Sequence, residues 1–192
     1  MKRTAKIERT TKETQIFVKI NLDGTGKSEI DTGYQFMDHL LTALSKHSSI
    51  DIDIKAKGDL AHHIIEDIGI CLGAALDKAL KDKKGIRRFG STYVPMDEAL
   101  VRVVLDLSGR PWHTVELKFK RTQVEDVVTQ DIYHFLVSLI YNAQMNLHLT
   151  TIYGEDDHHI AEAAFKALAL ALKEAVRIDD SQAEIPSTKG VF

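Results

Sequence analysis

A chain of 192 residues, 44% hydrophobic and 28% charged, has the composition of a globular protein with one large domain or two small ones. Its formal net charge of −3 argues against electrostatically driven nucleic-acid binding, which needs a basic face. No run approaches the roughly eighteen apolar residues of a membrane span. Because residues 1–20 also lack the apolar stretch of a secretory signal, we expect a cytoplasmic protein. The single cysteine, Cys71, lies in an apolar helical run, which favours a buried thiol.

The first half of the chain predicts two strands, a helix, a strand and a second helix. Residues 13–23 alternate as a strand does and end in the turn signal GTG, and residues 27–33 form a short second strand. Residues 34–48 carry apolar side chains at helical spacing. Residues 48–58 alternate strictly, as a half-buried strand does, and residues 62–82 predict a long helix.

The second half repeats this order after a linker at about 81–95. It predicts strands at 99–111 and 113–119, a helix at 129–144, a strand at 145–154 and a long helix at 158–176.

A shift of 96 residues lays residues 36–63 over residues 132–159 without a gap. We therefore predict an α+β fold, a two-layer α/β sandwich that arose by internal duplication of a β-β-α-β-α unit, because each sheet needs helices to cover its apolar face. Residues 1–90 would form the first half and residues 91–192 the second, together one compact catalytic unit.

Each half places two adjacent histidines and a glutamate at the start of its long helix, as HHIIE at 62–66 and HHIAE at 158–162. On a helix, Glu66 and Glu162 share a face with both histidines of their motif. Adjacent histidines point about 100° apart, so we expect one of each pair to bind one metal ion and its neighbour a second. A solvated helix end would explain one such motif. Two copies at the same register of a repeat favour metal binding.

Two ions need further ligands, and His39 and His148 are candidates, since the strand around His148 is expected to bury one face. Only His113 and His134 have no clear setting. The eight candidate metal ligands are His39, His62, His63, Glu66, His148, His158, His159 and Glu162. If the eight ligands are divided equally, each ion has three nitrogens and one oxygen. This set suits manganese, iron, cobalt, nickel or zinc better than calcium or magnesium. Four protein ligands in an octahedral sphere leave two positions for substrate or water, as in a catalytic site.

Six motifs follow one another in a combination specific to one known family. They are GYQFMDHLLTALSKH, HHIIED, RRFG, PMDEALVRVVLDLSGRP, DHHIAEAAFKA and PSTKG. From about Arg9 to the C-terminus the chain closely resembles the imidazoleglycerol-phosphate dehydratases of histidine biosynthesis.

The resemblance implies a fold like domain 2 of ribosomal protein S5. It implies a hydro-lyase that converts D-erythro-imidazoleglycerol phosphate to imidazole acetol phosphate with two Mn²⁺ per site and no organic cofactor. It implies the same eight metal ligands, and a homo-oligomer of 24 subunits with sites between subunits.

The resemblance also implies residues that contact this small phosphate substrate. They are Glu13, His47, Arg88, Arg110, Lys166, Ser187 and Lys189. Glu13 and His47 would be catalytic, although Glu13 alone suits a solvated strand position and His47 also suits a helix cap. The cationic residues and Ser187 are suitable donors to a phosphate dianion, and residues 180–192 would form a flap over the substrate.

Two other functions remain open at this point. A di-metal phosphate-ester hydrolase would use similar chemistry, although its ligands tend to be aspartates. A metal-storage or metal-sensing shell would keep the eight ligands but would not need Arg88, Arg110 or Ser187–Lys189. Turnover distinguishes them, because phosphate release indicates a hydrolase, an enol or ketone product a dehydratase, and no reaction a storage protein.

Overall fold

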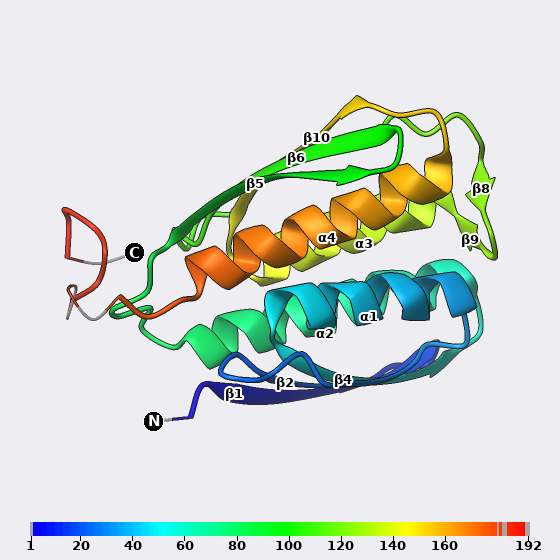
Figure 1. Ribbon diagram of the computed structural model, residues 1–192. Coiled ribbons are helices and arrows are strands. Elements are labelled where there is room, and N and C mark those ends of the chain that lie inside the picture. Colours follow the sequence, from blue (N-terminus) through cyan, green and yellow to red (C-terminus); the bar gives the residue numbers. More distant parts are fainter. Residues whose placement is uncertain (1, 180, 182–183, 191–192) are drawn as a thin grey trace.

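Four layers stack in the order sheet, helices, helices, sheet (Figure 1). This computed structural model describes residues 2–179, 181 and 184–190. Each half of the chain forms one sheet with two helices on one face, and the two helical layers pack against each other in the middle. The predicted α+β fold with an internal duplication is confirmed, and the two-layer unit occurs twice, back to back.

The first half contains a sheet of strand order β1-β2-β4-β3 and two helices. Its elements are β1 (Thr4–Thr10), β2 (Thr14–Asn21), β3 (Ser28–Asp31), α1 (Gln35–Ser48), β4 (Asp51–Gly58) and α2 (Ala61–Leu80). The apolar pattern does not predict the edge strand β1, because Ala5 is its one buried residue. Alternation in β2 turns Ile16, Val18 and Ile20 toward the helices, and all three are fully buried.

The second half repeats this order in a sheet β5-β6-β10-β7, with a small extra hairpin. Its elements are β5 (Phe89–Met96), β6 (Ala99–Asp106), β7 (Trp112–Glu116), β8 (Gln123–Val124), β9 (Val127–Val128), α3 (Thr129–Asn142), β10 (Asn146–Tyr153) and α4 (Asp157–Ala175). β5 occupies much of the expected linker. Gly90 and Pro95 suggest a loop there, but an edge strand tolerates proline. Gly90 lets β5 lie directly on α4, since a Cβ there would lie 2.0 Å from the Ala171 carbonyl oxygen.

The helices pair across the two halves, α1 with α4 and α2 with α3 (Figure 1). Gly69 and Gly73 allow α2 and α3 to approach closely, because an added Cβ would lie 2.6 Å from the Phe135 oxygen and 2.5 Å from the Leu139 oxygen, respectively. Each pair therefore joins one helix from each half, so any site at the helix ends combines residues from both.

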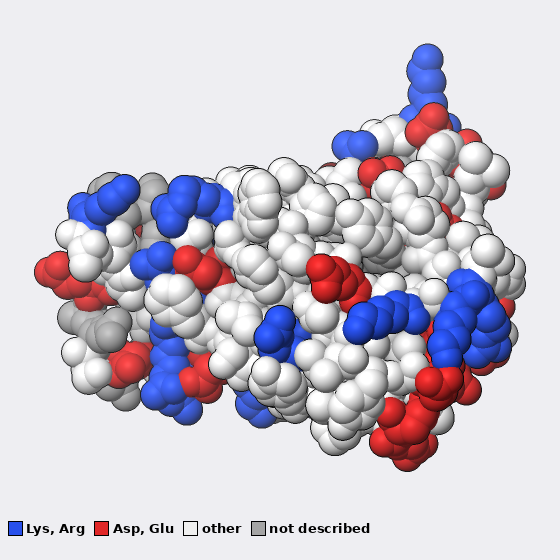
Figure 2. Space-filling view, turned by 90° about the horizontal axis from the view of Figure 1, so that it is seen from above, with Lys and Arg blue, Asp and Glu red and all other residues white. Residues whose placement is uncertain are grey.

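The outer face of the second sheet is largely uncharged at its centre, and charged side chains gather at its ends (Figure 2). Phe89, Tyr93, Val104, Ile152 and Tyr153 are large exposed apolar residues on its strands. Cys71 is buried, as predicted, and burial raises the pKa of its thiol to about 11. Among the described residues, no helix combines the length and apolar character needed to cross a membrane.

Candidate metal centre

One cluster of metal-ligating side chains lies where α1 meets the start of α4. Nε2 of His39 lies 3.4 Å from Oε2 of Glu162, and Nε2 of His158 lies 3.5 Å from the same oxygen. One ligand atom from each of the three residues lies within 4.8 Å of the others. The side chain of Asp156 accepts a hydrogen bond from the His158 amide at 2.8 Å and so fixes the first turn of α4. The cluster opens into a groove of about 810 Å³.

Glu162 is the most buried member of this cluster, with 8% of its surface exposed. Burial opposes its ionisation, but hydrogen bonds from Lys166 and His39 outweigh burial and hold the pKa of the carboxyl below its ordinary value. Lys166 Nζ lies 2.7 Å from Glu162 Oε1. Farther along α1, burial and then the charge of Lys166 lower the pKa of His47, which favours its neutral form. Glu162 is therefore an ionised candidate ligand held in place by a lysine.

A second cluster lies where α2 meets α3, and it contains a histidine that the sequence did not assign. Nε2 of His62 lies 3.8 Å from Glu66 Oε2, and the rings of His62 and His134 are 4.9 Å apart. His134 stands on α3 opposite the start of α2, as His39 on α1 stands opposite α4. The alignment of the two halves hides the correspondence between His39 and His134, because the shift of 96 residues lays His39 over Phe135, the residue after His134. A search allowing one residue of offset would have found it.

The second histidine of the first motif, His63, has a different partner from His62, and the two ring planes meet at 60°. Its Nδ1 lies 2.8 Å from Asp59 Oδ1 and 3.9 Å from Glu13 Oε2. The hydrogen bond to Asp59 raises the pKa of His63 above its ordinary value. Glu13, in the turn between β1 and β2, thus lies beside the α2 motif rather than in isolation.

The second histidine of the other motif, His159, contacts the turn between β5 and β6, and its ring plane lies at 87° to that of His158. Its Nδ1 lies 2.6 Å from Glu98 Oε2, and this hydrogen bond raises the pKa of His159. The backbone amide of Asp156 and then His159 lower the pKa of Glu98 to about 2. Both motifs therefore divide their two histidines between two directions.

His148 lies apart from both clusters. It is exposed on the outer face of its sheet, level with Val104 and Thr114 of the flanking strands, whereas Leu147 and Leu149 face the helices. We expected a buried face on this strand, and alternation gives that face to the leucines. His148 is thus on the other side of the sheet from α3 and α4.

The cationic residues expected to bind phosphate gather at the opposite end of α4. The Arg88 amide donates to the Ala175 carbonyl at 2.9 Å, and its guanidinium binds Asp106 at 2.6 and 2.9 Å and the Pro186 carbonyl at 2.7 Å. From Glu162 to Ala175, a helix rises about 20 Å. Arg110 follows shortly after Asp106, and Ser187 follows Pro186 directly, so both are near Arg88. Arg110 and Lys189 are exposed and Ser187 is half-buried. Lys166 alone lies beside the histidines.

Comparison with known proteins identifies the family. The family model of imidazoleglycerol-phosphate dehydratase matches residues 32–172. The dehydratase of Thermoanaerobacter pseudethanolicus is 48% identical to this chain over 193 residues, which cover 99% of this chain and 100% of the relative. The dehydratase of Mycolicibacterium gilvum is 50% identical over 203 residues, which cover 100% of both chains. The chain belongs to the imidazoleglycerol-phosphate dehydratase family.

Two solved dehydratase structures share this fold with a TM-score of 0.85. The Staphylococcus aureus enzyme is 38% identical and covers 92% of this chain and 99% of its own. The Pyrococcus furiosus enzyme, solved in complex with (S)-C348, is 39% identical and covers 97% and 100%, respectively. As a member of the dehydratase family, the chain is a lyase of histidine biosynthesis.

The donor set suits the metal chemistry expected of a dehydratase with this sequence. His39, His158 and Glu162 offer two imidazole nitrogens and one carboxylate, which fit a first-row divalent ion.

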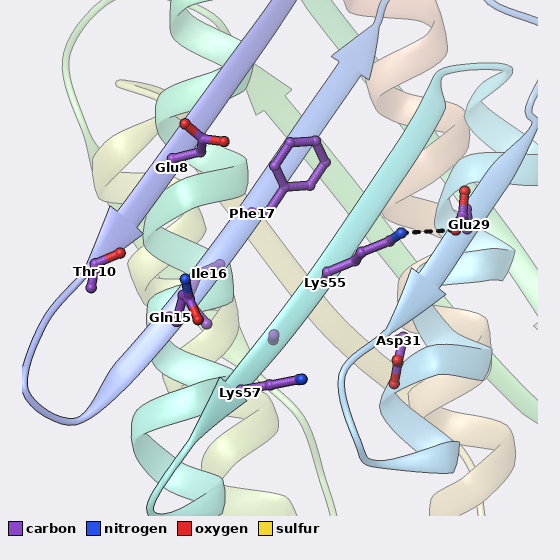
Figure 3. A pocket seen from close by; sticks show the side chains of 10 residues that line it. Glu8, Thr10, Gln15, Ile16, Phe17, Glu29, Asp31, Lys55 and Lys57 are labelled. Atoms are coloured by element: carbon purple, nitrogen blue, oxygen red, sulfur yellow. Dashed lines mark ion pairs between the residues drawn. The ribbon is translucent and has the colours of Figure 1, made fainter.

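A separate hollow of about 720 Å³ on the outer face of the first sheet is lined by Glu8, Phe17 and Lys55, among others (Figure 3). It lies across the sheet from the helices, so it is not part of the metal centre.

Proposed function

We propose that this member of the family dehydrates D-erythro-imidazoleglycerol phosphate to imidazole acetol phosphate at a site that holds two Mn²⁺. The observation that carries the proposal is the meeting of each HHxxE motif with a histidine from the other half of the chain. His39 joins the α4 motif, and His134 joins the α2 motif. Each cluster then supplies part of the ligand set of one ion.

The remaining ligands would come from neighbouring subunits. One chain brings two nitrogens and one oxygen together at the α1–α4 cluster, one nitrogen short of the expected three. His63 and His159 contact Asp59 and Glu98, respectively, outside the two clusters, and His148 lies on the outer sheet face. We assign His63 and His159, one for each ion, to ligation across subunit boundaries, and His148 would be a seventh imidazole beyond the six that two ions take.

The net reaction removes a hydroxyl from the carbon that bears the ring and a proton from the next carbon, and the resulting enol becomes the ketone. Bound divalent ions supply the positive charge that stabilises an ionised imidazole ring of the substrate. Glu13 is suited to move the proton, because its exposed carboxylate lies beside His63 at the metal end of the chain. Neutral His47, two turns along α1 from His39, is suited to a substrate contact.

Lys166 is the one assigned phosphate contact near the chain's own metal centre, and the others lie too far away to reach a substrate bound there. Arg88 lies about 20 Å along α4 from Glu162, whereas three carbons separate the imidazole from the phosphate. The phosphate contacts of Arg88, Arg110, Ser187 and Lys189 would therefore serve a metal centre of another subunit. The outer face of the second sheet, largely uncharged at its centre and carrying exposed aromatic and aliphatic side chains, offers a surface for such assembly (Figure 2). We propose a 24-subunit particle with shared sites.

The C-terminal tail would act as a flap at the shared site. The Arg88 guanidinium holds the Pro186 carbonyl one residue before Ser187, so phosphate binding near Arg88 would involve the tail directly. Residues 180, 182, 183, 191 and 192 of the proposed flap lie outside the described part of the chain.

Metal content, particle mass and turnover of the purified protein test this proposal together. We expect about two Mn²⁺ per chain, a particle near 24 subunits and formation of the ketone without phosphate release. Phosphate release would indicate a hydrolase, and metal binding without turnover a storage protein. A fully active monomer would contradict the shared site.

Subunit mixing tests the shared site directly. Glu162→Gln should inactivate the metal centre and Lys189→Ala the phosphate contact, but co-assembly of the two variants would recreate complete sites where the intact regions meet. We expect activity after disassembly and joint reassembly, and none when the two preassembled particles are only mixed. No recovery after joint reassembly would mean that both residues serve the same chain's site.

A further inference from the structure

All four histidines of the two HHxxE motifs share one contact, a carboxylate at Nδ1. Each carboxylate comes from outside the HHxxE motif. The pairs are His62 with Asp131 at 2.8 Å, His63 with Asp59 at 2.8 Å, His158 with Glu125 at 3.2 Å and His159 with Glu98 at 2.6 Å. A carboxylate at Nδ1 makes this nitrogen the hydrogen-bond donor, so the lone pair of a neutral imidazole lies on Nε2. Every motif histidine is therefore set to bind an ion through Nε2.

Asp131 differs from the other three carboxylates because it is buried, with 6% of its surface exposed. Asp59, Glu98 and Glu125 are exposed, so water competes for their hydrogen bonds. Asp131 stands on α3 and His62 on α2, and the close approach of these helices at Gly69 holds the two residues together. A buried charge-assisted hydrogen bond between rigid helices fixes an imidazole ring better than an exposed contact from a turn.

We propose that Asp131 is a positioning residue that holds His62 as the Nδ1–H tautomer, with Nε2 turned toward Glu66 and the metal ion. The proposal rests on the proposed metal-dependent function. A carboxylate behind a metal-binding histidine fixes the ring, sets the tautomer and raises its basicity, and its loss costs about 10–100-fold in metal affinity. No part of the dehydration requires Asp131 to touch the substrate.

The test is Mn²⁺ binding to the assembled particle, followed by the electron paramagnetic resonance signal of free Mn²⁺. We expect Asp131→Asn to weaken about half of the Mn²⁺ sites by about 10–100-fold, because an amide can donate to Nδ1 and so favour the wrong tautomer. Asp131→Glu keeps a carboxylate on the same helix position and should recover part of the affinity. Recovery by glutamate separates a positioning role from general loss of packing.

Asp51→Asn is the matched control, because Asp51 also accepts several hydrogen bonds but from the amides of Thr25 and Lys27, away from the histidines. We expect this variant to bind Mn²⁺ as the unmodified protein does. Unchanged affinity in Asp131→Asn, with normal metal content and turnover in the unmodified protein, would overturn the positioning role alone. Absence of Mn²⁺ binding by the unmodified protein would overturn the proposed function as well.

Discussion

Replacement of Gly69 by alanine tests whether the close packing of α2 on α3 sets the geometry of the metal centre. The added Cβ would lie 2.6 Å from the Phe135 carbonyl oxygen, whereas ordinary contact begins at 3.4 Å, so the helices must separate by about 0.8 Å, the difference between the two. The obstacle is backbone and cannot rotate away. Overpacking of this kind costs about 1–3 kcal/mol, while alanine returns about 1 kcal/mol through its helix propensity. The net effect should be destabilising, by about 1 kcal/mol.

The assays are thermal unfolding and turnover at fixed protein and metal concentration. One kcal/mol lowers the Tm by about 2–4 °C for a chain of this size. Because Phe135 follows His134, the displacement should also disturb the α2–α3 cluster, and misplacement by about 1 Å can cost about 100-fold in rate. Ala74→Gly, at a half-buried position of the same helix, gives a reference for the change in helix propensity without a backbone clash. If propensity were the only effect, Gly69→Ala would raise the Tm and leave turnover intact, and that result would refute the packing argument.

Three further predictions concern the site. Glu162→Gln and His62→Ala should lose Mn²⁺ and activity together, and full activity in both variants would contradict the two-metal site. Glu13→Gln should retain its metal and particle mass but lose about 10²–10⁴-fold in turnover, as expected for a proton-transfer residue, whereas metal loss would argue against that role. Hydrogen bonds to carboxylates raise the pKa of His63 and of His159, and a histidine must be neutral to bind a metal ion. Mn²⁺ affinity should therefore begin to decline at a pH above the ordinary histidine pKa of about 6.5 as the pH falls. Mn²⁺ titrations at a series of pH values measure this decline.

Local pattern was sufficient to predict the duplicated fold and the helices that carry the motifs. The spacing of His158 and Glu162 fixes their proximity on α4, because residues four apart on a helix share a face. Alternation was also sufficient to place His148 on the outer face, because the apolar residues Leu147 and Leu149 on either side of it face the core. The expectation of one buried face made His148 a candidate ligand, but that face belongs to the leucines.

Pairing between distant helices was not predictable from periodicity. The contact of His39 with α4 and of His134 with α2 depends on how the two helical layers stack, and amphipathic patterns specify a buried face but not its partner. The edge strands β1 and β5 were also missed, whereas the edge strands β3 and β7 were predicted. β5 shows too little alternation to distinguish it from a linker. Its Gly90 is explained by close contact with α4, because a Cβ at this position would lie 2.0 Å from the Ala171 carbonyl oxygen.

The pairing of helices across the two halves has a consequence for the origin of the chain. Two copies of a half-length polypeptide, related by a two-fold axis, would bring together the same helices and form both clusters as identical sites of a symmetric dimer. Joining the copies through the segment between α2 and β5 makes the sites independent of each other. His39 and His134 differ by one residue from equivalent positions, which strict symmetry would forbid. Gene fusion would thus have freed the two ancestral sites to diverge.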